Sequence, residues 1–420
     1  MHDLVLRHCL IADPLSNFHR QQADIGIRDG FISAIGQDLT GKEVWNAGGS
    51  FVSPGWVDLY SVCQDPGEEW TEDLHSLAAA GRDGGYTALC TLSGKDPRPD
   101  HAAVIQHVRR HPANDILPLW PIAAATAGMK GEDMAELYDL RQAGAIAFSD
   151  GTTPFRDAGV LMRVLEYAAQ WNFPVFAFPL NKSLAGKGSV NEGNTSVQTG
   201  LRSMPALAEE TAVAEIIRVA EYLQCPVHLS RISAAGSVAL IREAKARGAR
   251  ISCDVAALVL AYDDLEITSF DTNWKVMPPL RSQSDRMALC AGVADGTIDA
   301  VVSNHHARNT EQKQVEWDYA SFGAIGLQTT AHCLKAACID PFDWAQVLSH
   351  GPRKALGLET HILEPGNEAT LSIYNPDLGW KYSKAFNHSK SENSPLLGKQ
   401  LTGRAVASVQ CGRWLLQPAP

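Results

Sequence analysis

The chain contains the stretch Ala206-Leu-Ala-Glu-Glu-Thr-Ala-Val-Ala-Glu-Ile-Ile-Arg-Val-Ala220, in which apolar residues recur at three- and four-residue spacing. This spacing places them on one face of a helix, as a helix that packs against a core requires. A short candidate strand, residues 226–230, follows directly. The two segments together predict one helix–strand unit.

The same alternation extends in both directions, from about residue 55 to about residue 340. The expected strands are Trp56–Val62, Thr87–Leu92, Leu117–Ala123, Ala145–Phe148, Pro174–Phe178, Pro226–Ser230, Arg250–Asp254 and Asp299–Ser303. The expected helices are Thr71–Gly81, Ala102–Arg110, Asp133–Ala143, Asp157–Gln170, Ala206–Leu223, Gly236–Ala246, Ser284–Val293 and Tyr319–Ala337. Strands that are apolar throughout are typical of parallel sheets buried on both faces. Eight strand–helix units predict an α/β protein with a (β/α)8 TIM barrel.

The sequence pattern at the two ends of the chain is different and predicts short strands and turns in place of helices. We expect them to form one small β-sandwich domain from both termini. The predicted bounds are 1–53 and 356–420 for this composite domain and 54–355 for the barrel. The polar segment 376–396 is predicted to be a surface loop.

Composition narrows the possible partners and the compartment. The chain has 420 residues and a formal net charge of -11, and an acidic protein is a poor ligand for nucleic acid or anionic membranes. No run reaches the roughly 18 consecutive apolar residues of a membrane span. The first residues lack the features of a signal peptide. Nine scattered cysteines without a CxxC pair are typical of free thiols, so we expect a cytoplasmic protein.

A second stretch carries a family resemblance: Val52-Ser-Pro-Gly-Trp-Val-Asp58-Leu-Tyr60-Ser-Val62-Cys-Gln64-Asp-Pro-Gly67. It resembles the first-strand signature of the type I dihydroorotases, which are cyclic amidohydrolases. The resemblance continues through Gly144–Gly151, Met204–Glu210, Val227–Ser237, Lys275–Arg281, Asp295–His305 and Leu363–Tyr374. It implies the metal-dependent-hydrolase type of TIM barrel with a returning β domain.

The resemblance also implies a zinc site, which needs histidine and carboxylate ligands. The histidine positions of the family fall here on Tyr60, Val62, Phe178 and Arg231, and none of these side chains replaces a neutral imidazole. The aspartate that carries protons in the family falls on Asn304, and an amide cannot shuttle a proton.

The positions that hold substrate in the family differ as well. They fall on Gln64, Gly94 and Met277. Of the site residues only Asp150 and His305 persist, which is too few for a tight catalytic metal. We therefore expect no catalytic residue, no cofactor and no metal, and a pocket partly filled by side chains.

Structural roles are the simpler explanation for the polar residues that remain. Asp150 is expected to cap a turn or to pair with Arg231. His305 and His306 are adjacent on a strand end and cannot both face one lumen site, so a hydrogen-bonded role is favoured. Cys63 is expected to face the helices rather than the lumen, which disfavours a cysteine nucleophile.

The resemblance extends to inactive dihydroorotase-like chains that accompany aspartate carbamoyltransferase. It implies a chain that is not an enzyme: a noncatalytic subunit of that transferase in pyrimidine biosynthesis, in a dodecamer of six plus six chains. Self-association as a dimer is also expected. Two alternatives stay open, namely an active or repurposed cyclic amidohydrolase with an atypical metal site, and a sensor of a pyrimidine intermediate.

Overall fold

Eight parallel strands form a closed ring in the computed structural model, which describes residues 1–94 and 96–418. They are β6 (Trp56–Cys63), β7 (Tyr86–Ser93), β8 (Leu119–Ala123), β9 (Ala147–Phe148), β10 (Phe176–Ala177), β13 (Val227–Leu229), β14 (Ile251–Ala256) and β15 (Ala300–Val302). β6 to β9 pair in sequence, and so do β10, β13, β14 and β15. A bridge from Phe148 to Val175 joins the two groups, and β16 (His305–His306) pairs with β6 to close the ring.

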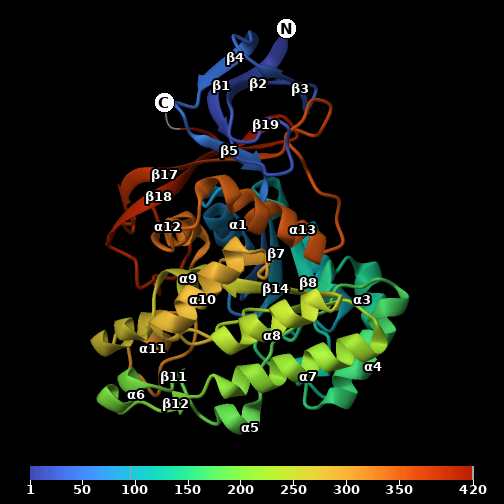
Figure 1. The fold of residues 1–420 in the computed structure, drawn as a ribbon, viewed down its shortest axis with the longest axis vertical. Coiled ribbons are helices and arrows are strands. Elements are labelled where there is room, and N and C mark those ends of the chain that lie inside the picture. Colours follow the sequence, from blue (N-terminus) through green and yellow to red (C-terminus); the bar gives the residue numbers. More distant parts are fainter. Residues whose placement is uncertain (95, 419–420) are drawn as a thin grey trace.

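Helices surround this ring and connect its strands (Figure 1). They are α1 (Leu74–Asp83), α2 (Ala102–Arg110), α3 (Leu137–Ala143), α4 (Ala158–Gln170), α5 (Lys182–Ala185), α6 (Asn194–Thr199), α7 (Leu207–Leu223), α8 (Ala235–Ala246), α9 (Ala257–Ala261), α10 (Gln283–Ala294), α11 (Thr310–Lys313), α12 (Thr330–Ala336) and α13 (Gly351–Ala355). Several begin at a side chain that accepts a backbone N–H, as an N-cap should. Asp157 accepts from Val160 before α4, and Ser282 accepts from Asp285 before α10.

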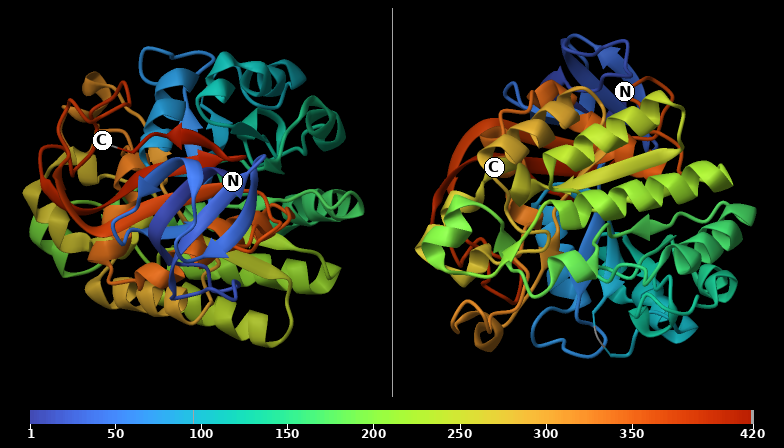
Figure 2. Two further views of the ribbon diagram at one scale, coloured as in Figure 1. Left: turned by 90° about the horizontal axis from the view of Figure 1, so that it is seen from above. Right: turned by 60° about the horizontal axis from the view of Figure 1, so that its bottom comes forward.

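The two ends of the chain build one eight-stranded sheet, which lies at one end of the barrel (Figures 1 and 2). Its strands are β1 (His2–Ile11), β2 (Gln22–Arg28), β3 (Phe31–Gly36), β4 (Gly41–Asn46), β5 (Phe51–Pro54), β17 (Leu371–Lys381), β18 (Gln400–Gln410) and β19 (Arg413–Leu416). β5 pairs with β1 on one side and with β17 on the other, so it joins the amino-terminal and carboxyl-terminal strands. The predicted fold class is confirmed, while the exact domain bounds stay a prediction.

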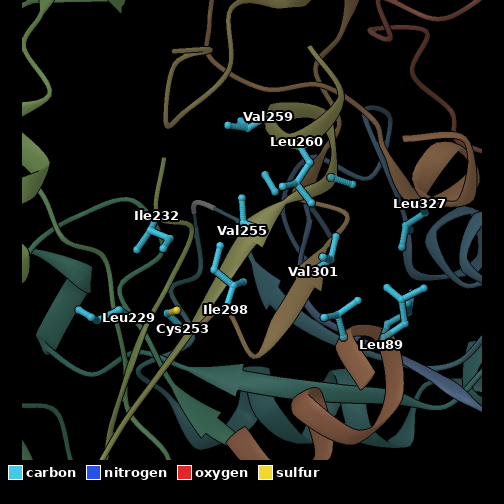
Figure 3. Packing of buried hydrophobic residues seen from close by; sticks show 14 of the residues in the cluster. Leu89, Leu229, Ile232, Cys253, Val255, Val259, Leu260, Ile298, Val301 and Leu327 are labelled. Carbon is cyan, nitrogen blue, oxygen red and sulfur yellow. The ribbon is translucent and has the colours of Figure 1, made fainter. Parts of the chain in front are cut away.

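The main core lies between the barrel strands and the surrounding helices. Figure 3 shows part of it, with Leu229, Cys253, Val255 and Val301 from the strands and Leu260 from α9. All five are completely buried. The side chains that alternate with them along β14, Ser252 and Asp254, are polar. This alternation gives the barrel an apolar outer face and a partly polar interior, as inward- and outward-facing residues of a barrel strand require.

Two expectations about elements are wrong in part. The helix predicted over Tyr319–Ala337 begins only at Thr330, because Ala324 pairs with β16 and the chain has left-handed backbone at Gly323. The segment 376–396 is not simply a surface loop, because β17 runs through residue 381 and Ser391 and Asn393 are buried. Hydrogen bonds to main-chain oxygens offset the desolvation of these polar groups.

Among the described residues, no helix combines the length and apolar character that crossing a membrane requires.

Two further strands, β11 (Val190–Asn191) and β12 (Ser203–Met204), form a small parallel pair in the excursion between β10 and α7. Together with α5, α6 and α11 they lie at the end of the molecule opposite the terminal sheet (Figure 1).

Candidate active site

Arg231 occupies the barrel interior, at the position where the family resemblance places a histidine. Its guanidinium carbon lies 3.4 Å from the centre of the Tyr60 ring and 5.1 Å from that of Phe178. Its Nη2 donates to the carbonyl of Gly151 at 2.6 Å. Three of the positions singled out in the sequence therefore form one cation–aromatic cluster. Val62 is buried beside Tyr60 in the same apolar cluster.

The Arg231 guanidinium retains binding capacity. The residue is fully buried, and its Nε and Nη1 have no hydrogen-bond partner among the residues that the structure describes. A buried guanidinium with two free donors is costly unless an anion or another acceptor completes it. A carboxylate or another acceptor that reached Arg231 would complete these donors.

Asp150 does not pair with Arg231, contrary to one of the two roles expected for it. It caps the turn after β8 instead: Oδ1 accepts from the main-chain N–H groups of Ala125 and Thr126, and Oδ2 accepts from the Thr126 hydroxyl. Burial raises the pKa of Asp150 above its ordinary value. Both oxygens therefore have a structural task.

His305 lies apart from this cluster. Its Nε2 is 3.1 Å from Oε2 of Glu72, and the hydroxyl of Ser389 donates to the same carboxylate. All three residues are buried. The Cys63 thiol donates to the main-chain oxygen of Glu72, and burial raises its pKa well above the ordinary value, so it remains a thiol. This arrangement is a structural network.

A small cavity of about 90 Å³ brings together other residues of the carboxyl-terminal strand ends (the barrel mouth). It is lined by Thr152, Met277, Asn304, His306, Arg308, Phe322 and Gly323. The Asn304 amide donates to the Met277 carbonyl at 3.2 Å, which explains how two of the substituted positions meet. The active sites of TIM barrels lie at this end of the barrel.

His306 is the histidine of this cavity. Burial, followed by the charge of Arg308, lowers its pKa well below the ordinary value, and Arg231 contributes to the same shift. The imidazole is therefore neutral near pH 7. The Gln64 amide nitrogen is 3.5 Å from Nε2 of His306, and the Gln64 carbonyl oxygen fills the space that a Cβ on Gly94 would need.

Deeper in the barrel, polar pairs fill the space below the mouth. His228 lies 2.8 Å from the Asp254 carboxylate, and Asp58 accepts from the N–H and the hydroxyl of Ser303. Burial raises the pKa of Asp58 to about 7. His228 is a satisfied interior histidine.

The zinc site that the family resemblance implies does not fit the residues present here. Val62 and Phe178 carry no donor atom, and Arg231 covers the ring of Tyr60 with a positive charge. Asp150 is the remaining carboxylate, and both of its oxygens accept hydrogen bonds from the turn after β8. Zinc requires several nitrogen, oxygen or sulfur ligands that converge on one point.

Sequence reasoning missed Arg308, which reaches the cavity through the loop after β16, and the group formed by Asp65, His107 and His111. The sequence does indicate the second group, because His107 and His111 are four residues apart at the end of an expected helix and so lie on the same side of it.

Known proteins resemble the chain over almost its whole length. The family described as "Dihydro-orotase-like" matches residues 49–237. A dihydroorotase of Pelotomaculum thermopropionicum is 36% identical over 99% of this chain and 98% of its own. A dihydroorotase of Pelobacter propionicus is 33% identical over 98% of this chain and 99% of its own. The structure of an L-hydantoinase (dihydropyrimidinase) from Arthrobacter aurescens, 20% identical, superposes with a TM-score of 0.87 and covers 100% of this chain and 97% of the other.

These relatives correct one expectation. The chain was expected not to be an enzyme, and full-length relatives 30–36% identical to it bear the name of an enzyme, Dihydroorotase. Substitution of the family's metal positions removes one route to hydrolysis. It leaves His306 and the partly buried Arg308 at the barrel mouth, and the fully buried Arg231 in the barrel interior. The chain belongs to the dihydroorotase-like family of the cyclic amidohydrolases.

Proposed function

We propose that the chain is an enzyme of pyrimidine biosynthesis that opens or closes the cyclic amide of dihydroorotate at its barrel mouth. The full-length similarity to proteins named Dihydroorotase supports the substrate. The observation that carries the proposal is that two donors of the buried Arg231 have no partner among residues 1–94 and 96–418. Dihydroorotate bears a carboxylate, which is the kind of group that such a guanidinium binds.

The reaction adds water across the ring amide. The hydroxide part joins the carbonyl carbon, the C–N bond breaks, and the nitrogen takes up the proton. In the proposed arrangement His306 accepts the proton of the attacking water and returns it to the leaving nitrogen. Arg231 and Arg308 stabilise the negative charge on the substrate carboxylate and on the oxygen of the addition intermediate. Ring closure follows the same steps in reverse.

The test is turnover by the purified chain in both directions, with dihydroorotate and with carbamoyl aspartate. We expect Arg231→Met and His306→Gln each to lower kcat/KM by about 100-fold or more, as the loss of an oxyanion donor or a general base does. Arg218→Met and His101→Gln, at exposed positions, are the matched controls and should keep full activity.

Thermal unfolding of each variant must show that it is folded. Absence of turnover by the unaltered chain in both directions, under conditions in which a dihydroorotase relative is active, would overturn the proposal. Turnover by the Arg231 and His306 variants at the rate of the unaltered chain would also overturn it.

We also propose that the chain associates with the catalytic chain of aspartate carbamoyltransferase, in a complex of six plus six copies, and that it self-associates as a dimer. The family resemblance motivates this partner. Large apolar side chains that are mostly exposed support a docking surface: Val197, Leu265 and Tyr319 are 84%, 62% and 80% exposed. Their segments adjoin, since Thr195 donates to Asp264 and Arg202 is 3.9 Å from Asp318.

Co-expression with the transferase chain of the same organism tests this association. We expect the two chains to co-purify in equal numbers, and the mass of the complex to report the stoichiometry. The double variant Leu265→Glu and Tyr319→Glu should abolish co-purification, whereas Tyr222→Glu, equally exposed on α7, should not. Chains that stay separate, or a complex that both variants leave intact, would contradict the proposal.

A further inference from the structure

A second group of potential ligands lies outside the barrel interior, between the loop after β6 and α2. Asp65 comes two residues after β6, while His107 lies on α2 and His111 directly follows it. One ligand atom from each of the three lies within 4.8 Å of the others. We propose that Asp65, His107 and His111 bind a divalent transition metal, for which Zn²⁺ is the best match.

Asp65 is the fixed member of this group. It is buried, and its Oδ2 accepts from the N–H of Leu74, the first residue of α1. Its Oδ1 lies 2.7 Å from Nε2 of His107. A hydrogen bond joins these atoms, and a cation that takes the place of its proton gains one carboxylate and one imidazole ligand.

The two histidines are four residues apart, so they lie on the same side of one helical turn. The rings of His107 and His111 are 5.4 Å apart. Nδ1 of His111 accepts from the Ala113 N–H at 3.2 Å. Coordination by either ring nitrogen gives up this hydrogen bond, because Nδ1 then either binds the metal or carries the ring proton. Both modes present one imidazole nitrogen to the metal.

His75 of α1 lies close enough to be a fourth ligand. The ring of His75 lies 4.8 Å from that of His111, edge to face. His75 is exposed and able to turn, and water can fill the same coordination position. Two imidazoles and one carboxylate, with water or a third imidazole, form the tetrahedral donor set of zinc. Magnesium and calcium prefer oxygen ligands and do not fit this set.

The metal would connect the loop between β6 and α1 to α2. It would involve neither Arg231 nor His306, so the inference is independent of the proposed function.

The test is a zinc titration of the full-length chain, after removal of metal with a chelator, in competition with a zinc indicator. We expect one equivalent of Zn²⁺ to bind. His107→Asn and His111→Asn should each weaken binding by about 100-fold, because each removes one of three protein ligands. His101→Asn, at an exposed position just before α2, is the matched control and should bind as the unaltered chain does.

Two further readouts separate this site from any metal in the barrel. Co²⁺ bound to the unaltered chain should give the visible absorption bands of tetrahedral coordination, and His111→Asn should lose them. Zn²⁺ should raise the Tm of the unaltered chain but not that of the His111 variant. Zinc affinity unchanged in both histidine variants, or lost instead in Asp150→Asn, would overturn the proposal, as would a chain that binds no zinc.

Discussion

Arg231 illustrates how one residue can lower the stability of the fold and still be suited to bind a ligand. Its charge is fully buried, two of its nitrogens lack partners among the described residues, and its φ of 58° lies in the left-handed region. Asn304, across the barrel mouth, has a φ of 49°. Backbone strain and unpaired buried groups of this kind gather at functional sites, where a ligand completes them.

Replacement of Arg231 by methionine should therefore separate stability from ligand binding. We expect the free energy of unfolding to rise by about 1 kcal/mol, because an apolar side chain of similar length avoids the desolvation of the charge. Urea unfolding of Arg231→Met measures it. Dihydroorotate should raise the Tm of the unaltered chain but not that of the variant. A variant that is less stable yet still responds to dihydroorotate would contradict this account.

His306 should set the acid limb of the pH–rate profile. A base works only when deprotonated, and burial lowers its pKa, so the rate should stay constant through pH 6.5 and fall only at lower pH. The lowered pKa also means that stability is present above pH 6.5 and is lost as the pH falls toward the folded-state pKa. Profiles of kcat/KM between pH 5 and pH 8 test the first statement. An acid limb centred at or above pH 6.5 would exclude His306 as the base.

At the scale of single elements, α1 shows how a local sequence signal becomes a contact with a distant segment. Asp73 caps α1 by accepting from Ser76 N–H at 2.7 Å, and the Ser76 hydroxyl accepts in return from the Asp73 N–H. The Asp73 carboxylate also meets Lys390 at 2.6 Å. The helix start is thereby tied to the chain that returns from the terminal sheet.

Changes at Asp73 should distinguish the cap from the ion pair. Asp73→Ala removes both and should cost about 1 kcal/mol, the usual value of an N-cap. Asp73→Asn keeps a capping oxygen and loses only the charge. It should lower the free energy of unfolding by only about 0.3 kcal/mol, since ion pairs near the surface contribute little. Urea unfolding of both variants measures the difference. Equal losses in the two would show that the ion pair, not the cap, is the stabilising contact.

For the molecule as a whole, an aromatic cluster joins the barrel to the terminal sheet. Trp344 stacks on Tyr374 of β17 with ring centres 4.8 Å apart, and Trp56 of β6 lies 5.1 Å from the same tyrosine. All three are fully buried. The Ser372 hydroxyl adds a polar link, since it accepts from Trp56 N–H and donates to the Gly85 carbonyl. The two parts thus share one interior.

The barrel and the sheet should therefore unfold together. Trp344→Ala should lower the free energy of unfolding by about 3–5 kcal/mol, the range for removal of a large buried side chain. Calorimetry should still show one transition. Trp344→Phe is the milder control and should lose less. Two separated transitions in the alanine variant would show that the sheet and the barrel are independent units.

Local patterns were enough to predict the eight barrel strands, most of the helices and the β strands at both ends. Hydrophobic periodicity and helix caps act over a few residues, so they can be read along the chain. The positions of Tyr60, Phe178 and Arg231 were predictable too, because the family resemblance aligns them one by one.

Contacts between segments far apart in the chain required the three-dimensional structure. Glu72 meets His305 across 233 positions, and Ser389 reaches the same carboxylate across 317. The buried polar segment near Asn393 looked like a loop because its hydrogen-bond partners are distant in sequence. The cluster of Arg231 with Tyr60 and Phe178, and the group of Asp65, His107 and His111, depend on the same kind of contact. Periodicity specifies which face of an element is buried, but only the packed chain specifies which polar group that face meets.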